Sequence, residues 1–375
     1  MPIRTIHIDT ARTWRGGQNQ ALLTVNGLRA LGHPTMLLAH PDGELRRRAP
    51  QTPELVPLAP RFEIDFHAAW KLARLIRSFD PVVLHAHDPH GVALAALALG
   101  FRMPWPPPRL VASRRVDFKL AGNALSRAKY RMVDRFVCAS TAIGGILEAG
   151  GIEPDRIVTV HEGVDLAHVA EAPPVPVHET FWLPHGAPVV LNVAALVPHK
   201  GQRYLIDAFA DVVRVVPDAR LVILGQGELH DSLLKRVHYH GLDKHVLLPG
   251  FRTDVLSLMK TADLFVMSSV MEGLGTSLLD AMACARPIVA TQTGGIPEVV
   301  VHEETGLLVP PRDSDSLADA IIALLKDDAR ARQYGAAGYE RVHRRFSVDH
   351  MVAETVVVYE QLQAERPATR FAGKP

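Results

Sequence analysis

Short apolar segments alternate with amphipathic segments along almost the whole sequence, and this alternation restricts the possible folds more than any other feature. Strand-like segments in the first half include Ile3 to Ile8, Thr35 to Ala39 and Pro81 to His85, with helix-like segments between them. Strands separated by helices form parallel sheets that are covered by helices on both faces. The sequence therefore predicts an α/β fold built on doubly wound parallel sheets.

A proline-rich segment divides this pattern into two halves. Residues 172–177 read Ala-Pro-Pro-Val-Pro-Val, a composition typical of a linker. Strand and helix signals resume at Val189, and 375 residues exceed what one core needs. We expect a Rossmann-like N-terminal domain at 1–171, a linker at 172–177, a second domain at 178–345 and a terminal helical segment at 346–375.

Composition excludes several classes of protein. Apolar residues make up 47% of the chain and charged residues 22%, which argues against a disordered chain or a fibre. With 41 basic and 40 acidic side chains, no overall field attracts nucleic acid. The two cysteines rule out a disulfide framework, and the longest apolar run is too short to span a membrane. Without a signal-peptide block at the start, we expect a soluble, cytoplasmic protein.

Positive charge is concentrated in one part of the first half. Nine basic and two acidic residues lie between Arg102 and Arg135, and apolar residues are interspersed among them. This pattern fits a solvated helix face. It also fits contact with an acidic acceptor or with an anionic membrane surface, in which case the protein would be peripheral at the inner membrane face.

The strongest chemical motif runs from Glu272 to Asp280. It follows the strand-like segment Leu264 to Met267 and begins a helix near Thr276. A helix start offers unpaired N–H groups to sugar hydroxyls or phosphate oxygens, and Gly275 lets a ligand approach the backbone closely. Two carboxylates eight residues apart can each bind hydroxyl groups. The alternative is a glycine turn followed by an ordinary amphipathic helix.

The motif resembles the Glu-x7-Glu signature of the retaining GT-B glycosyltransferases of the bacterial group 1 family, family 4, with Asp280 in place of the second glutamate. Further blocks in the family's order strengthen the resemblance: Trp14-Arg-Gly-Gly-Gln, Asn192 to Gly201, Leu221 to Gly227, Leu248-Pro-Gly-Phe, Thr291 to Glu298 and Glu304 to Pro310. The resemblance covers nearly the whole chain. It implies two Rossmann-like domains facing across a cleft, with the terminal helix crossing back to the first domain.

The resemblance also implies an activity. A sugar would pass from a nucleoside diphosphate sugar, with uridine as the most frequent base, to a hydroxyl acceptor such as a cell-envelope or lipid-linked glycan. Configuration at the sugar would be retained, and neither a metal nor a cofactor is expected. The alternatives are a non-catalytic member that binds a nucleotide-sugar and a nucleotide-sugar isomerase on the same architecture. The incomplete glycine fingerprint at Gly225 makes an NAD-dependent oxidoreductase a weaker hypothesis.

Roles for individual residues follow from the resemblance. Glu272 would contact the sugar, Asp280 the ribose hydroxyls, and Lys200 the departing diphosphate. The remaining donor-binding positions are Gly16 and Gly17 for the phosphates, Leu274, Gly275 and Thr276 for the sugar and phosphate, and Phe251 and Arg252 at the base.

Two departures from the family pattern concern charge. Ala195 stands where the family places an arginine in a Gly-Arg-Leu tripeptide. Arg115, with Arg114 beside it, occupies the place of the histidine in a Thr-x-His motif. We expect Arg114 or Arg115 to supply the missing positive charge, with Arg115 as a catalytic residue.

Histidines cluster after one strand-like segment, where the sequence reads His85-Ala-His-Asp-Pro-His. Histidine and carboxylate side chains are zinc ligands, so a metal site is conceivable. The family has a similar His-x-His segment that serves packing and the acceptor side. We therefore expect His85, His87 and Arg114 on the acceptor side, with no metal.

Overall fold

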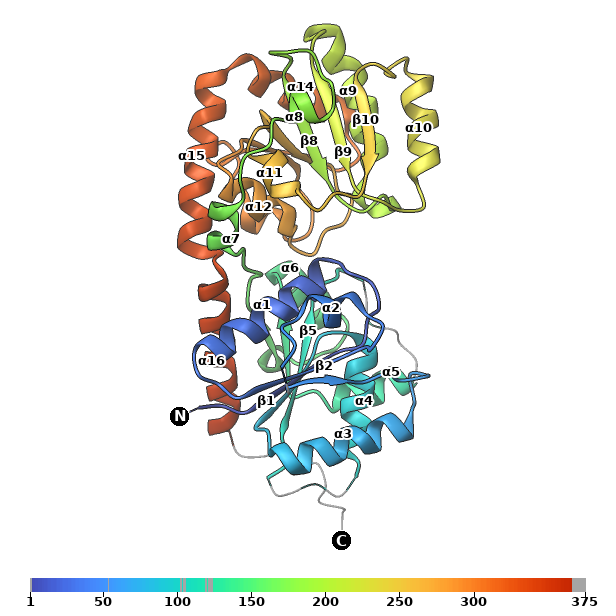
Figure 1. Cartoon of the computed structure of the whole chain (residues 1–375), viewed down its shortest axis with the longest axis vertical. Coiled ribbons are helices and arrows are strands. Elements are labelled where there is room, and N and C mark those ends of the chain that lie inside the picture. The colour runs from blue at the N-terminus through green and yellow to red at the C-terminus, as the bar shows by residue number, and fades with distance from the viewer. Residues whose placement is uncertain are drawn as a thin grey trace. The chain divides into compact units, whose positions relative to one another are not determined.

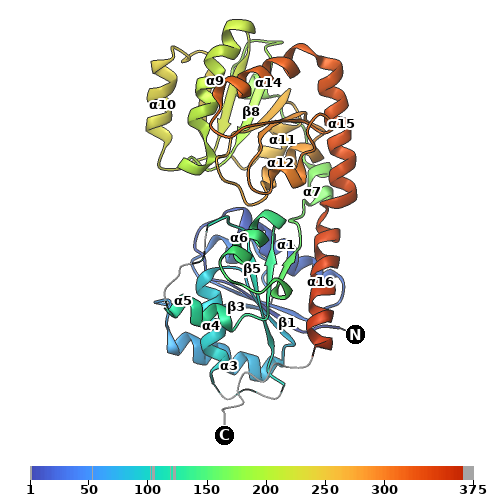
Figure 2. The same ribbon diagram turned by 180° about the vertical axis from the view of Figure 1, so that it is seen from behind.

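The computed structural model describes residues 2–365 except 53, 102, 104, 105, 119 and 121–123. The predicted loop from Pro104 to Pro108 thus lies partly outside the described residues. The chain divides into two compact units (Figures 1 and 2). Unit 1 comprises Met1–His161 and Val348–Pro375, and unit 2 comprises Glu162–Ser347.

Unit 1 contains a seven-stranded, fully parallel sheet with the order β3-β2-β1-β4-β5-β6-β7. The strands are β1 (Thr5–Asp9), β2 (Thr35–Ala39), β3 (Leu55–Pro57), β4 (Val83–Ala86), β5 (Arg109–Arg114), β6 (Arg135–Cys138) and β7 (Ile157–Thr159). The strands are short, and the central ones are buried on both faces, as expected for a doubly wound sheet.

The helices of unit 1 come from both ends of the chain. They are α1 (Gly16–Ala30), α2 (Glu44–Arg48), α3 (Phe66–Phe79), α4 (Pro89–Leu99), α5 (Ala124–Arg131), α6 (Thr141–Ala149) and the last helix, α16 (Val348–Ala364). Helix α16 lies beside α1 (Figures 1 and 2) and buries Val352 and Tyr359 in the same core as Leu28 and Val111. A β-carbon at Gly27 would come within 2.5 Å of Val352, so the two helices approach closely there.

Unit 2 contains a six-stranded parallel sheet with the order β10-β9-β8-β11-β12-β13. The strands are β8 (Val189–Val193), β9 (Arg220–Leu224), β10 (Val246–Gly250), β11 (Leu264–Met267), β12 (Ile288–Thr291) and β13 (Leu307–Val309). The helices are α7 (Leu166–Glu171), α8 (Val177–Thr180), α9 (Gln202–Val215), α10 (His230–Tyr239), α11 (Val255–Met259), α12 (Thr276–Ala283), α13 (Ile296–Val299), α14 (Ser314–Lys326) and α15 (Asp328–Arg345). Both sheets agree with the predicted fold class.

The strand order defines one switch point in each sheet. In unit 2 the chain runs from β8 outward to β10 and then returns to β11, on the other side of β8. In unit 1 it runs from β1 outward to β3 and returns to β4. Ligands of doubly wound sheets bind outside the carboxyl ends of the strands at such a switch point. We therefore expect a ligand site to be formed by the loops after β8 and β11 in unit 2, and another by those after β1 and β4 in unit 1.

The boundary between the units lies earlier than the predicted linker. Unit 2 begins at Glu162 because the segment up to residue 177 packs on it. The Val175 N–H donates to the Ser257 carbonyl at 3.1 Å, and the Val177 N–H donates to Thr261 at 3.1 Å. The proline-rich segment is thus part of unit 2.

The structure also assigns the chain from Val348 onward to unit 1. In the described part of the chain, no helix combines the length and apolar character that crossing a membrane requires.

Candidate active site

Lys200 and Glu272 form an ion pair at the switch point of unit 2. Lys200 ends a short 3-10 turn after β8, and Glu272 lies in the loop between β11 and α12. The Lys200 Nζ atom donates to Glu272 Oε2 at 2.5 Å, and Ser269 Oγ donates to the same oxygen at 2.9 Å. The two side chains are 20% and 10% exposed, so the pair is mostly shielded from water. The structure thus brings together two residues that the sequence places 72 positions apart.

Glycines allow the two loops to pack against each other. Gly201 has φ 68°, and a β-carbon there would lie 2.1 Å from the Ser268 carbonyl oxygen. At Gly294 (φ 52°) a β-carbon would lie 1.8 Å from the Glu272 carbonyl oxygen. Real β-carbons do not approach oxygen so closely, so any side chain at either position would displace the loop that carries Glu272.

The Gly-x-Gly block after β9 has the same function. A β-carbon at Gly225 would lie 1.9 Å from the Ala194 carbonyl oxygen, and one at Gly227 would lie 2.3 Å from that of Leu196. These glycines let the loop after β9 approach the loop after β8. The close packing explains the motif without a dinucleotide.

Helix α12 begins beside the end of β8. Gly275 is its N-cap in the left-handed conformation (φ 94°), and no side chain caps the helix. Ser277 Oγ donates to the Val193 carbonyl at 3.1 Å, which ties the first turn of α12 to the last residue of β8. The uncapped first turn, starting at Thr276, offers N–H groups and the positive end of the helix dipole to an anion. Leu274, which precedes Gly275, is buried.

Asp280 lies one turn into α12 and is partly buried. Its carboxyl group makes no hydrogen bond to another described residue. Burial raises the pKa of Asp280 to about 7. Hydrogen bonds from a ligand would stabilise the charged form of a carboxyl group that is buried and has no donor of its own. A pair of ribose hydroxyls would donate such bonds.

The predicted base-binding residues follow the end of β10. Phe251 is 53% exposed. Arg252 donates to both carboxylate oxygens of Asp254, at 2.8 and 2.5 Å, and this contact raises the pKa of Arg252 and lowers that of Asp254. The guanidinium of Arg252 is therefore held by its neighbour, which leaves the backbone as the part suited to contact a base.

At the switch point of unit 1, the structure groups Gly17, His87 and Arg115. A β-carbon at Gly17 would lie 3.7 Å from Arg115 Cδ, and Arg115 Nη1 lies 3.1 Å from His87 Nδ1. Gly16 begins α1. Arg114 instead hydrogen-bonds the Phe118 carbonyl, and burial lowers its pKa. Of the two arginines that the sequence left open, only Arg115 belongs to this group.

Asp9, which the sequence analysis missed, anchors the loop before α1. It accepts hydrogen bonds from the Ala11 N–H at 3.0 Å and from Gln18 Nε2 at 3.1 Å. Burial, followed by the nearby Asp88 carboxylate, raises the pKa of Asp9 to about 6. Asp88 caps α4 and also accepts a 2.6 Å hydrogen bond from Thr10 Oγ1. Each acid lies at or just beyond the end of a central strand, a position that could have indicated its role.

His7, His85 and His87 are fully or almost fully buried, and one nitrogen of each lies within 4.8 Å of the others. Among the described residues, these three histidines are the group of possible ligands whose nitrogen atoms lie close enough together to bind one metal ion. Hydrogen bonds to other side chains or to one another already engage five of their six ring nitrogens. The Arg115 guanidinium in contact with His87 also disfavours a dication. The arrangement fits a hydrogen-bonded network better than a metal site.

The basic segment in unit 1 is partly neutralised. Lys129 Nζ lies 2.5 Å from Glu63 Oε1, and Arg135 pairs with Glu365. Arg127 and Arg131 of α5 remain exposed. Exposed aromatic side chains flank Glu63 in the sequence, with Phe62 at 73% and Phe66 at 66% exposure.

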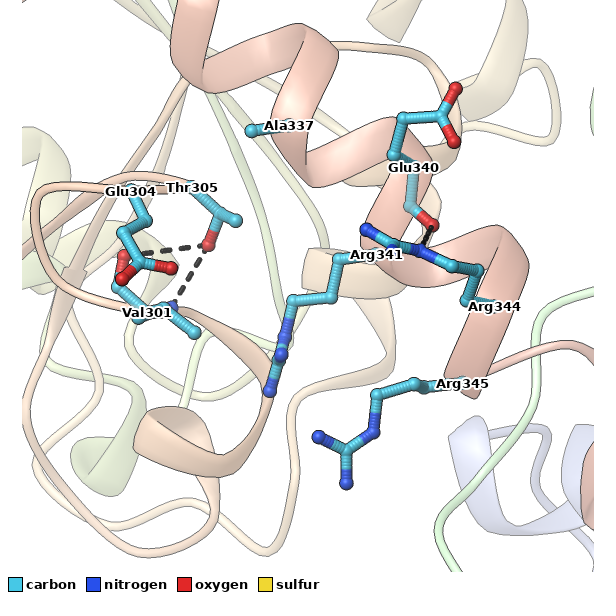
Figure 3. A pocket seen from close by; sticks show the side chains of 8 residues that line it. All are labelled: Val301, Glu304, Thr305, Ala337, Glu340, Arg341, Arg344 and Arg345. Carbon is cyan, nitrogen blue, oxygen red and sulfur yellow. Dashed lines mark hydrogen bonds between the residues drawn. The ribbon is translucent and has the colours of Figure 1, made fainter.

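Unit 2 contains a cavity of about 440 Å³ (Figure 3), and none of the residues predicted to bind the donor lines it. Side chains of α15 and of the turn after α13 line it, among them Arg341, Arg345 and Glu304. Arg341 donates to the Val299 and Glu298 carbonyls at 2.8 Å each, which ties α15 to α13. We interpret these contacts as structural.

Comparison with known proteins identifies the family. The family described as "Glycosyltransferase Family 4" matches residues 14–168, and "Glycosyl transferases group 1" matches residues 178–341. The chain belongs to the group 1, family 4 glycosyltransferases, in agreement with the resemblance noted in its sequence.

Several curated proteins are similar in sequence. The GDP-mannose-dependent alpha-(1-6)-phosphatidylinositol monomannoside mannosyltransferase of Mycobacterium tuberculosis H37Rv is 39% identical over 176 residues, covering 44% of this chain and 46% of the relative. The N-acetyl-alpha-D-glucosaminyl L-malate synthase of Bacillus anthracis is 29% identical over 56% of this chain and 55% of its own length. These two matches thus span about half of each relative. The phosphatidyl-myo-inositol mannosyltransferase of Mycobacterium leprae is 27% identical over 92% of both chains.

Solved structures share the fold. Anabaena HepE in complex with UDP and glucose has a TM-score of 0.81 at 19% identity, covering 96% of this chain and all of that one. A glycosyltransferase from Rickettsia africae has a TM-score of 0.83 at 18% identity, covering 97% and 100%. The two parallel-sheet α/β domains are those of the GT-B architecture.

Proposed function

We propose that the protein is a retaining glycosyltransferase that moves a hexose from a nucleoside diphosphate sugar to a hydroxyl acceptor. The observation that carries the proposal is the Lys200–Glu272 pair beside the uncapped start of α12, at the switch point of unit 2. Lysine and a helix N-terminus supply positive charge for a diphosphate. The mostly buried carboxylate supplies negative charge for a sugar carbon that becomes cationic.

The reaction needs both kinds of charge. The bond between the sugar's anomeric carbon and the diphosphate breaks, and the diphosphate leaves with the electron pair. The acceptor oxygen bonds to the same carbon, and its proton passes to the departing diphosphate. Lys200 and the N–H groups from Gly275 to Ser277 stabilise the departing phosphate, and Glu272 stabilises the positive sugar ring. Because these groups supply the positive charge, we propose that transfer needs neither a metal nor a cofactor.

The donor is defined by residues of unit 2. Asp280 would accept the ribose hydroxyls, and the backbone at Phe251 and Arg252 would border the base. Uridine is the base expected from the resemblance, and the Mycobacterium tuberculosis relative is named for GDP-mannose. We therefore propose a hexose donor with uridine or guanosine as its base, to be distinguished by direct comparison.

We propose that unit 1 binds the acceptor. Two of the relatives are named for transfer to phosphatidylinositol or its mannosides. We propose a lipid-linked or envelope glycan as acceptor, reached by peripheral contact with the anionic inner face of the membrane. Arg127, Arg131, Phe62 and Phe66 supply the exposed basic and aromatic side chains for such contact.

The test is transfer itself. The protein is incubated without metal with UDP-glucose or GDP-mannose and with phosphatidylinositol or a bacterial lipid extract. Release of nucleoside diphosphate and the anomeric configuration of the glycolipid are then measured. We expect one donor to be consumed and the α-configuration of its sugar to be kept. A β-linked product would refute retention, and absence of nucleoside diphosphate release from both donors would contradict the proposed function.

A further inference from the structure

A chain of hydrogen bonds runs through unit 1 from the last helix to Arg115. Its members are His7, His85, His87, Ser113 and Tyr359, called here the histidine chain. The β1–β4 register places His7 beside His85. The side chains of His7, His85 and Tyr359 are at most 2% exposed. Arg115, at the end of the chain, is partly exposed and can therefore contact a substrate.

The contact with Arg115 determines where the protons lie on two of the histidines. A guanidinium only donates hydrogen bonds, so His87 Nδ1, 3.1 Å from Arg115 Nη1, is unprotonated and accepts. His87 then carries its proton on Nε2 and donates to His7 Nδ1, 2.8 Å away. His7 in turn carries its proton on Nε2. That nitrogen is buried without a partner among the described residues.

The other branch of the chain has one arrangement in which every hydroxyl and nitrogen is paired. Tyr359 donates from its hydroxyl to His85 Nδ1 at 2.5 Å, and His85 Nε2 donates to Ser113 Oγ at 2.8 Å. Ser113 then donates to His87 Nδ1 at 3.2 Å, beside Arg115. In the reverse order the Tyr359 hydroxyl proton would have no acceptor within the chain. Both branches therefore require an unprotonated Nδ1 on His87.

The histidines of the chain are neutral at physiological pH. Burial lowers the pKa of His7 to about 3, with Arg29 and Arg115 adding to the effect. Burial also lowers the pKa values of His85 and His87 well below the ordinary value, again with a contribution from Arg115. A protonated His87 would meet the Arg115 cation directly. The acceptor at Nδ1 is therefore present throughout the physiological range.

We propose that the histidine chain is a positioning device: it holds His87 in the tautomer that accepts from Arg115, and so orients the guanidinium toward a phosphate oxygen of the substrate. His7, Ser113 and Tyr359 are new positioning residues for the reaction. Tyr359 makes the last helix part of this device. The inference rests on the proposed function, because it needs a phosphate-bearing substrate.

Turnover of the preferred donor tests the positioning role. His87→Leu removes the acceptor, whereas His87→Asn keeps an amide oxygen near the position of Nδ1. A hydrogen bond to a charged group contributes enough that its loss lowers kcat/KM about tenfold. We expect that loss in His87→Leu, recovery to within about threefold of wild type in His87→Asn, and no change in the control His238→Leu, whose side chain is 84% exposed. Equal kcat/KM for His87→Leu and wild type would overturn the proposal.

Calorimetry with UDP and GDP on the same variants identifies which phosphate is contacted. If the contact is to the donor, His87→Leu binds the preferred nucleoside diphosphate more weakly than wild type. If Arg115 instead contacts a phosphate on the acceptor, His87→Leu binds the nucleoside diphosphate as tightly as wild type does, while its kcat/KM falls. Either result supports a phosphate contact, and an unchanged affinity with unchanged kcat/KM overturns it.

A spectroscopic test does not depend on activity. Nitrogen-15 NMR of histidine-labelled protein distinguishes an unprotonated ring nitrogen from a protonated one, and His87→Asn assigns the signals of His87. We expect His87 Nδ1 to be unprotonated and its signal constant between about pH 5.5 and 8.5. In Tyr359→Phe we expect the signals of His85 to shift. A proton on His87 Nδ1, or titration of His87 near its ordinary pKa, would overturn the proposal even if no donor were turned over.

Discussion

Replacing Asp280 with asparagine should make the ligand-free protein more stable at high pH. Burial raises the pKa of Asp280 to about 7, whereas the ordinary pKa of an aspartate side chain is 3.8. Between these values the folded protein keeps a proton that the unfolded chain has lost. The free energy of unfolding therefore falls as pH rises from about 4 to 7 and then levels off. Asparagine carries no charge in either state, so Asp280→Asn removes this loss.

The size of the effect follows from the shift. One pKa unit corresponds to about 1.4 kcal/mol, so the full shift sets an upper limit of about 4 kcal/mol above pH 7. Because the side chain retains some contact with solvent, we expect about 2 kcal/mol.

Urea unfolding of wild type and Asp280→Asn at pH 4.5 and pH 8 measures the effect. The control is Asp319→Asn, an exposed aspartate on α14. The two proteins should differ little at pH 4.5, and Asp280→Asn should be more stable at pH 8. A difference that is the same at both pH values, or greater stability of wild type at pH 8, would refute the reasoning.

Two other predictions concern loop packing and the membrane. Gly294→Ala places a β-carbon 1.8 Å from the Glu272 carbonyl oxygen and should lower the free energy of unfolding by more than about 2 kcal/mol. Gly241→Ala, at φ 66° with open space around it, should lower it by only about 1 kcal/mol, and equal losses in urea titrations would argue against the packing account. Wild type should float with anionic vesicles but not with neutral ones, whereas Arg127→Glu/Arg131→Glu should float with neither. Equal recovery of both proteins with anionic vesicles would remove the membrane contact.

Most of the fold could be predicted because the central strands are continuous apolar runs. The bounds of β2 and β11 match the predicted segments Thr35 to Ala39 and Leu264 to Met267 to the residue. The edge strands β3 and β7 were not predicted, because each has only three residues and is partly exposed. Helices α2 and α6 were also not predicted: α2 is a single short turn rich in arginine, and α6 contains two adjacent glycines that weaken a helical signal.

The glycine motifs predicted where the site of unit 2 lies, but not the reason for the glycines. Glycine is required because loops far apart in the sequence lie too close together in the structure to leave room for a β-carbon, as at Gly201 and Gly294. Sequence also left open whether Arg114 or Arg115 supplies the missing positive charge. Side chains alternate along a strand, so Ser113 and Arg115 point to the same side and Arg114 to the other. This alternation was available from the sequence and would have favoured Arg115.

The histidine chain could not have been found from sequence alone. His7 and His85 meet through strand pairing across 78 residues, and Tyr359 reaches His85 only because α16 returns to unit 1. The available signal was weaker: His7 lies between two isoleucines in the most apolar part of β1. A buried polar residue at such a position needs a hydrogen-bond partner, but the pattern does not say which.

Calorimetry of nucleoside diphosphates in the absence of metal tests the central claim, that the Lys200–Glu272 pair marks a diphosphate site. UDP, GDP and ADP are titrated into wild type, Lys200→Ala, Glu272→Ala and the control Lys235→Ala, an exposed lysine on α10. We expect wild type to prefer one nucleoside diphosphate. Lys200→Ala should bind it roughly 100-fold more weakly, whereas Lys235→Ala should bind it as wild type does. Glu272→Ala should keep or gain affinity, because Lys200 loses its internal partner. Equal affinity for Lys200→Ala and wild type, or no binding of any of the three nucleotides, would contradict the account.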